Sequence, residues 1–203
     1  MQLAKKMQNW VKSLSSTRII VFSFALIILT GTFLLVLPSA SRSGESIQLL
    51  DALFTATSAT CVTVLVIADT LTQWSLFGQL VILALIQVGG LGMITLATFF
   101  SVLLGRKISM RGKIFAQKSI SDYNFSDVLQ MIRSVIRITF GFEFAGAVLL
   151  SFSFVPLYGL RGFYLAAFHS VSAFCNAGFD LFGNYRSLTE FNGSPLVLYT
   201  LSF

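Results

Sequence analysis

The sequence predicts an all-α membrane protein made of tandem helix–loop–helix repeats, and three observations support this prediction. Only 11% of the 203 residues are charged and 55% are hydrophobic, whereas soluble domains average about 25% charged residues. Three long stretches contain at most one charge each. The positive charges gather in the two regions beside these stretches, a pattern typical of chains that cross a membrane several times.

The charge-poor stretches are residues 19–37, 71–105 and 138–160, the last containing only Glu143. A helix needs about 20 mostly apolar residues to cross the hydrocarbon core, so each stretch is long enough to span the membrane. A further apolar run starts at Ser194 and stops ten residues later. We therefore expect three spans and a last helix that is truncated.

The distribution of basic residues predicts the orientation of the chain. Four precede the first span and seven lie between the second and third: Lys5, Lys6, Lys12 and Arg18, then Arg106, Lys107, Arg111, Lys113, Lys118, Arg133 and Arg137. The positive-inside rule places both groups in the cytoplasm. This predicts a multi-pass protein of the plasma (bacterial inner) membrane with a cytoplasmic N-terminus at residues 1–17. The net charge of +6 is explained by this topology, so no nucleic-acid partner is expected.

Two uncharged stretches, residues 52–68 and 162–179, are predicted to be re-entrant loops. If residues 52–68 crossed the membrane, the basic region at residues 106–137 would lie outside, against the positive-inside rule. The stretch also carries many hydroxyl groups. Irregular backbone at membrane depth is tolerated only where it is buried in protein or lines a water-filled cavity. Each stretch therefore enters and leaves on the external side.

The two loops are copies of one another. A shift of 114 residues aligns Phe54, Ser58, Ala59 and Cys61 with Phe168, Ser172, Ala173 and Cys175. Each copy then comprises a span, a short helix, an extended segment and a second span. The first repeat covers residues 18–105, the second covers residues 138–203, and residues 106–137 form a basic cytoplasmic connector. Such loops can hold backbone carbonyls around an axis and replace the hydration shell of a monovalent cation. Two copies cannot close that ring.

Several motifs resemble one family of transporters. The segment FHSVSAFCNAGFD at residues 168–180 resembles the second pore loop of the Trk/Ktr/HKT potassium transporter superfamily, and TSATCVT at residues 57–63 resembles its first filter. QVGGLG at residues 87–92 resembles the glycine-rich stretch of the following helix, and RKIS at residues 106–109 resembles the basic turn after it. The bacterial Ktr-type membrane subunit is the most similar subgroup, and the chain resembles its N-terminal half, with two of four repeats.

This resemblance implies tandem helix–pore loop–helix repeats, as in potassium channels, and uptake of potassium, possibly of sodium. It implies a homodimer on a cytosolic ring of nucleotide-binding regulatory subunits, in addition to contacts with membrane lipid. We expect that the chain is not an enzyme and that it holds no cofactor. The expected transported ion is K+. One alternative is a truncated, non-conducting half-protein or assembly partner of the family. Another is a secondary transporter with broken helices.

The resemblance also implies the ion-binding residues. Their backbone carbonyls would form two selectivity filters: Thr60, Cys61, Val62, Thr63 and Val64 in the first loop, and Cys175, Asn176, Ala177 and Gly178 in the second. Asp180 would lie in the outer vestibule and attract cations. The family pattern has glycine where this chain has Val64. Because filter backbones use conformations that suit glycine, we hypothesise that Val64 impairs conductance or selectivity.

Four polar residues in apolar surroundings suggest roles other than ion conduction. Catalysis by Cys61 or Cys175 with His169 is disfavoured, since nothing activates the thiols. His169 is expected to bond a neighbouring helix. A carboxylate within a span is costly and usually faces a partner, so Glu143 is expected to bond the pore-helix region rather than an ion.

The glycines at positions 89, 90 and 92 suggest either a hinge or close helix packing. Small residues let membrane helices approach one another. Packing is therefore the favoured reading.

Overall fold

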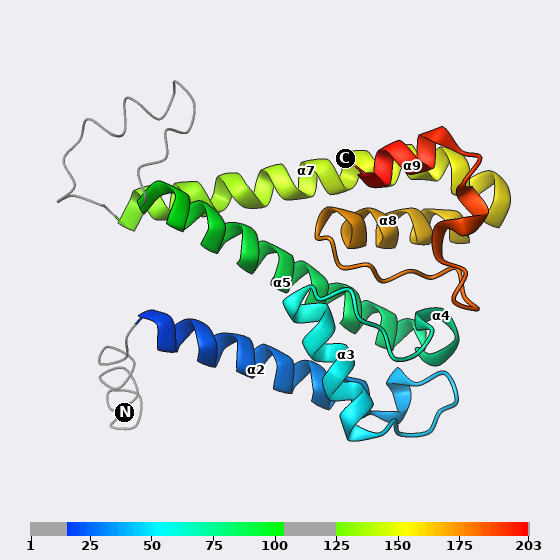
Figure 1. Ribbon diagram of the computed structural model, residues 1–203, viewed down its shortest axis with the longest axis horizontal. Coiled ribbons are helices and arrows are strands. Elements are labelled where there is room, and N and C mark those ends of the chain that lie inside the picture. Colours follow the sequence, from blue (N-terminus) through cyan, green and yellow to red (C-terminus); the bar gives the residue numbers. More distant parts are fainter. Residues whose placement is uncertain (1–15, 104–124, 203) are drawn as a thin grey trace.

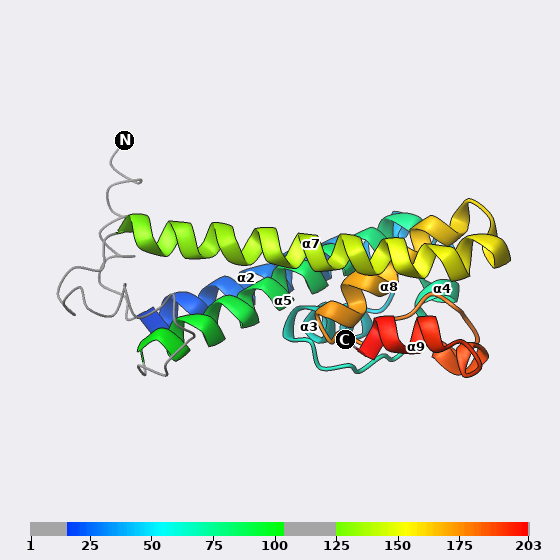
Figure 2. The same cartoon turned by 90° about the horizontal axis from the view of Figure 1, so that it is seen from above.

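The computed structural model describes residues 16–103 and 125–202. Every regular element in these two ranges is helical, and the protein is an all-α membrane protein, as the sequence predicts. Long helices cross the molecule, and shorter helices fill the space between them (Figure 1). In a second view, α7 runs along the molecule, with α3, α8 and α9 gathered toward the end where α4 lies (Figure 2).

The segment predicted as the first repeat contains α2 (Ser16–Val36), α3 (Leu49–Cys61), α4 (Thr70–Gln73) and α5 (Leu76–Leu103). The helix α2 ends just before Pro38, which opens the short 3-10 helix η1 (Pro38–Ala40). Residues that precede a proline avoid helical conformation, and Leu37 is extended, with ψ 138°. The element α3 is the short helix of the first predicted re-entrant loop.

The stretch at residues 71–105, expected as one span, does not form a single helix from its first residue. Its first residues belong to α4, and Trp74 is extended and pairs with Ser41 in an isolated bridge. The Asp69 carboxylate accepts hydrogen bonds from the backbone N–H groups of Leu71 and Thr72 at 3.0 Å, so it caps α4. The long helix therefore starts only at Leu76, and Gly105 lies outside the described residues.

The segment predicted as the second repeat contains most of α7 (Phe125–Tyr158), together with α8 (Arg161–Phe174), the 3-10 helix η2 (Ser187–Phe191) and α9 (Pro195–Ser202). The helix α7 begins within the expected connector at residues 106–137 and carries Arg133 and Arg137 in the same helix as the predicted span. The remainder of that connector up to residue 124 lies outside the described residues, as does the N-terminus at residues 1–15.

The core lies where the two short helices meet the long ones. The helix α3 packs against α2 and α5, while α8 packs against α7, α5 and α9. The buried side chains include Leu35, Ile82, Ile86, Leu150 and Phe154. Because α5 contacts both α3 and α8, it joins the two repeats and brings the segments that follow these helices close together.

The outer faces of the long helices are apolar. Large exposed side chains include Phe22, Leu26, Leu29 and Phe33 on α2 and Phe144 and Phe152 on α7, as expected for surfaces in contact with lipid. Within the described residues, the helix over Ile132–Tyr158 is long and apolar enough to cross a membrane. The apolar helices over Ile20–Val36 and Leu76–Gly92 are shorter, so the expected three crossings stay a prediction.

Candidate functional site

Two segments of equivalent backbone conformation follow the short helices. We call residues 62–69, after α3, the first loop and residues 175–186, after α8, the second loop. Val62 and Asn176 have φ values of 55° and 54°, and Val64 and Gly178 have φ values of 63° and 69°. The members of each pair are 114 residues apart, the separation of the sequence repeat. Non-glycine residues rarely adopt positive φ, so this shared pattern marks a specific structure.

The matched serines hold these loops in place. Ser58 Oγ donates a hydrogen bond to the Leu65 carbonyl at 2.6 Å, and Ser172 Oγ donates to the Phe179 carbonyl at 2.7 Å. Their backbone carbonyls accept from Thr63 N–H at 3.2 Å and Ala177 N–H at 2.7 Å respectively. The residues matched in sequence thus make the same bonds in each copy, and they fold each loop back along its helix.

The predicted filter residues differ in exposure. Thr60, Cys175 and Ala177 are buried, and Cys61 and Val62 are half-buried. The exposed ones are Thr63, Val64, Asn176 and Gly178. Thr60 Oγ1 is buried and has no hydrogen-bond partner among the described residues.

The two loops meet at Val64 and Gly178. A Cβ atom added to Gly178 would lie 3.2 Å from Val64 Cβ and in clash with Val64 Cγ1. The Val64 side chain is nevertheless 54% exposed. The structure thus brings the ends of both predicted filters together, with a valine in the conformation that glycine has in the other copy.

The glycine pair of α5 contacts the end of α3 and the start of the second loop. A Cβ atom on Gly89 would lie 2.8 Å from the Thr60 carbonyl carbon, and one on Gly90 would lie 2.9 Å from Cys175 Cβ. Both contacts leave no room for a side chain, in agreement with the packing interpretation. A Cβ atom on Gly92 would instead lie 3.1 Å from Phe24 Cζ of α2.

Comparison with known proteins identifies the family. A family model described as TrkH, cation transport protein, matches residues 3–203 of the chain. The chain belongs to the TrkH family. That family is one of cation transporters, not of enzymes, and its members are membrane proteins.

The curated relatives of this TrkH-family chain include uptake proteins from three bacteria. The potassium/sodium uptake protein NtpJ of Enterococcus hirae is 41% identical over 85% of this chain and 39% of its own length. The Ktr system potassium uptake protein B of Bacillus subtilis is 36% identical over 98% of this chain and 44% of its own length. The Ktr system potassium uptake protein B of Vibrio alginolyticus is 39% identical over 91% of this chain and 40% of its own length. The chain thus spans about two fifths of the length of these relatives.

Glu143 of the TrkH-family chain is buried between two helices. Its Oε1 accepts a hydrogen bond from Gln87 Nε2 of α5 at 2.8 Å. Its backbone carbonyl accepts from Ser170 Oγ of α8 at 2.7 Å. The contact to the short helix expected from the sequence thus goes through the main chain, whereas the carboxylate binds the neighbouring long helix. Gln87, one of two glutamines in a mostly apolar helix, was the available signal for this partner.

His169 has a structural role that differs from the expected one. Its Nδ1 lies 2.7 Å from the Leu165 carbonyl, and its Nε2 accepts from Leu181 N–H at 3.2 Å. These two bonds assign the proton to Nδ1. The ring also stacks on Phe182, with centroids 4.3 Å apart. The expected bond to a neighbouring helix is therefore wrong: the ring ties its own helix to the second loop, because the chain folds back there.

Asp69 links the two loops and was not found from the sequence. In addition to capping α4, its Oδ2 accepts from Tyr185 N–H at 2.9 Å, and its side chain is buried. Burial raises the pKa of Asp69, but the hydrogen bonds from the N–H groups of Tyr185, Thr72 and Leu71 outweigh it, and the pKa lies below its usual value. A contact between residues this far apart leaves no pattern in one sequence.

Asp180, expected in the outer vestibule, makes local bonds. Its carboxylate accepts from Phe182 N–H at 3.1 Å and from Ser187 Oγ at 2.9 Å. The residue is half-buried. It therefore shapes the second loop, and its effect on cations stays a proposal.

The depressed pKa of Asp69 predicts a pH dependence of stability. The ionised carboxylate stabilises the fold above the pKa of the unfolded chain, about 4. That contribution is lost as the pH falls through the lower pKa of the folded state. We expect Asp69→Asn to lower the stability of the purified protein at pH 7 by about 1.5–3 kcal/mol, with the difference becoming smaller as the pH falls below about 4. Thermal unfolding measured from pH 7 to pH 3 checks this. The exposed Glu45, changed to Gln, is the control, and a pH-independent Asp69→Asn effect would contradict the prediction.

Proposed function

We propose that this chain forms two of the pore-lining repeats of a potassium uptake transporter of the Trk/Ktr type. The observation that carries the proposal is the repeated loop conformation, with left-handed residues at the same two positions of each copy and with the loops in contact at Val64 and Gly178. The names of the relatives, which are potassium or potassium/sodium uptake proteins, support the choice of ion.

Ion binding would use backbone oxygens. Residues 60–64 and 175–178 are the proposed filter segments, and their carbonyls replace the water around K+. In these segments, residues with left-handed backbone conformation alternate with residues of negative φ. Consecutive carbonyls can then face the same side, whereas they point to opposite sides in a regular strand. The buried Thr60 hydroxyl lacks a partner among the described residues, and a cation ligand would remove the cost of leaving it unsatisfied. Asp180 would attract cations to the outer mouth.

The proposal extends to the assembly. Two loops cannot surround an ion, so further filter segments complete the ring. We propose a multi-pass protein of the plasma membrane with a cytoplasmic N-terminus, on the basis of the segregated positive charges. We also propose a homodimer that binds a cytosolic ring of regulatory nucleotide-binding subunits, because two of the relatives are named as parts of a Ktr system.

Rubidium uptake tests the assignment of the filter. In cells without other potassium uptake systems that produce the protein containing this chain, Gly178→Ala should reduce rubidium uptake at least tenfold, because a side chain is strained at φ +69° and collides with Val64. Gly44→Ala is the matched control, since Gly44 has φ +74° and open space around it. The amount of protein in the membrane is measured for both. Unchanged uptake by the Gly178→Ala variant would refute the filter assignment.

A non-conducting member of the family remains the second candidate, and Val64 is the observation that favours it. A branched side chain at positive φ between the two loops would narrow the path. If the unmodified protein supports no uptake but the Val64→Gly variant does, this candidate is correct.

A further inference from the structure

A pocket of about 420 Å³ lies between the two repeats, away from the meeting point of the loops. Its walls come from the end of η1, from α4, from the start of α5 and from the start of α8. The residues that line it are Ser41, Arg42, Leu71, Trp74, Ser75, Leu76, Gln79, Arg161 and Tyr164. Two of them are cationic, and none of these described lining residues is acidic. The pocket is therefore electropositive.

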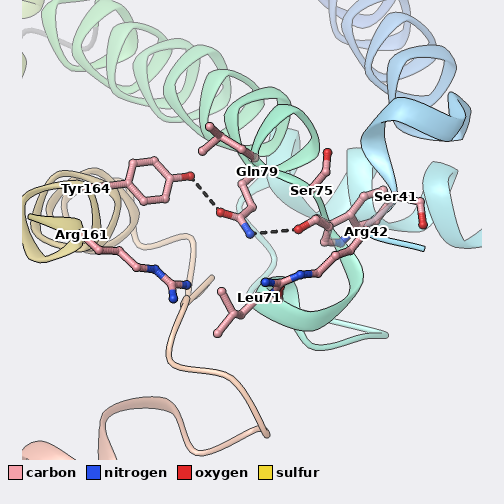
Figure 3. Close-up of a pocket in the computed structure, with 9 residues that line it drawn as sticks. Ser41, Arg42, Leu71, Ser75, Gln79, Arg161 and Tyr164 are labelled. Carbon is pink, nitrogen blue, oxygen red and sulfur yellow. Dashed lines mark hydrogen bonds between the residues drawn. The ribbon is translucent and has the colours of Figure 1, made fainter. Parts of the chain in front are cut away.

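Both arginines have donors to spare. Arg42 Nη1 donates to the Leu71 carbonyl at 2.8 Å, which uses one of the five N–H groups of its guanidinium. The Arg161 guanidinium donates no hydrogen bond to any residue that the structure describes. The two guanidinium groups approach Leu71 from opposite sides (Figure 3). Planar guanidinium groups of this kind match the oxygens of a phosphate in pairs.

The polar floor of the pocket is already satisfied and is neutral. Gln79 Nε2 donates to the Trp74 carbonyl at 2.9 Å, and Gln79 Oε1 accepts from Tyr164 OH at 3.0 Å. Ser75 Oγ donates to the Ser39 carbonyl at 2.6 Å. These bonds fix the floor across both repeats, and they leave the arginines as the groups that would bind a ligand.

Two carboxylates of this end of the molecule are engaged elsewhere. Asp69 accepts from three backbone N–H groups. Glu190 forms an ion pair with Arg186 at 2.6 Å. Arg161 is also the first residue of α8, whose first turn holds no acid. A cation at a helix N-terminus opposes the helix dipole. An anion bound there would be attracted both by the Arg161 guanidinium and by the dipole of α8.

Exposed apolar side chains lie on or next in sequence to the lining residues of the pocket. Leu76 lines the pocket and is exposed. Leu160, which is 87% exposed, precedes Arg161, while the exposed Phe77 and Phe163 adjoin Leu76 and Tyr164 in the sequence. A small soluble anion gains nothing from these apolar side chains. A phospholipid would place its phosphate between the arginines and its acyl chains against these side chains, since apolar surface gains from contact with lipid chains.

We propose that this pocket binds the phosphate of an anionic phospholipid headgroup and that the bound lipid bridges the two repeats. The ligand is recognised by Arg42 from the first repeat and Arg161 from the second. This assignment does not depend on ion conduction, because lipid binding is measured without transport.

Lipid retention in the purified protein containing this chain tests the proposal. In detergent micelles, dioleoylphosphatidylglycerol should bind more tightly than dioleoylphosphatidylcholine, as read by native mass spectrometry and by the rise in melting temperature. Each arginine contributes about a fivefold gain in affinity. The double variant Arg42→Gln, Arg161→Gln should therefore lose the preference for phosphatidylglycerol, while Arg186→Gln, outside the pocket, keeps it.

One further variant and one further ligand separate lipid binding from its alternatives. Arg161→Lys keeps the charge but loses the paired donors, so we expect intermediate affinity and a melting temperature without lipid like that of the unmodified protein. Inorganic phosphate alone should give no rise in melting temperature. Equal binding of the two lipids, an unchanged double variant, or an equal rise with inorganic phosphate would each overturn the lipid assignment.

Discussion

Val64→Gly is expected to increase rubidium uptake by the protein that contains this chain. Val64 has φ 63°, and a branched residue in the left-handed region stores strain of about 1–3 kcal/mol. Glycine reaches this conformation without steric cost, and its equivalent in the second loop is Gly178 at φ 69°. Removal of the side chain also clears the space beside Gly178, so the filter would have glycine at this position in both copies.

The expected size follows from the space that the Val64 side chain occupies beside Gly178. If about 1.4 kcal/mol of the barrier to ion passage disappears, uptake rises about tenfold. Initial rates of rubidium uptake in cells without other potassium uptake systems measure this, with sodium competition as a test of selectivity. The matched control is Val66→Gly, since Val66 lies in the same loop, is 44% exposed and is outside the positive-φ set.

The control separates two effects of the substitution. A gain shared by Val66→Gly would reflect general loosening of the loop, and unchanged uptake with Val64→Gly would show that valine is harmless there. The strain argument also predicts that the purified Val64→Gly variant unfolds at a higher temperature. A lower melting temperature would contradict it.

Gly89→Ala is expected to destabilise the protein strongly. The added Cβ would lie 2.8 Å from the Thr60 carbonyl carbon and 3.0 Å from Thr60 Cα. These are backbone atoms of the end of α3, which the core holds in place, so they cannot move aside without displacing the first loop. Overpacking of this kind costs about 1–3 kcal/mol, and rubidium uptake should fall with it.

A graded series checks the cause. Gly90→Ala meets side-chain atoms of Cys175, of which the sulfur can rotate and the Cβ, at 2.9 Å, must shift. Gly89→Ala meets only backbone atoms, so the effect of Gly90→Ala should be the smaller one. Gly141→Ala is the matched control, because nothing lies within 4 Å of the added Cβ and alanine is the better helix former. Melting temperatures of the purified variants measure the series. If Gly89→Ala kept its stability but altered uptake, the hinge interpretation of the glycines would replace packing.

Much of the fold was predictable because it depends on local patterns. The low charge and the apolar stretches predicted long helices, and α2, α5 and α7 occupy those stretches. The shift of 114 residues predicted equivalent loops, and the matched serines make the same bonds in each. The departure at Val64 was visible as a single residue out of pattern, because the requirement for glycine is a property of one backbone position.

The contacts between helices could not be predicted in the same way. Glu143 was expected to have a partner, but Gln87 became that partner only because α5 packs against α7. His169 was expected to bond another helix, and it binds the loop that returns over its own helix. The boundary expected at residue 138 rested on charge, whereas α7 extends through Arg133 and Arg137, since charged residues do not end a helix.

The sequence by itself determined the membrane environment and the matched loop residues, and its resemblance to the family marked the position of the unusual valine, because composition, period and backbone preference act within short segments. The tertiary structure alone decided that Asp69 binds Tyr185, that Gly89 touches Thr60 and that Arg42 and Arg161 share one pocket. These pairs are distant along the chain, and the packing of two repeats on α5 is what brings their atoms within reach.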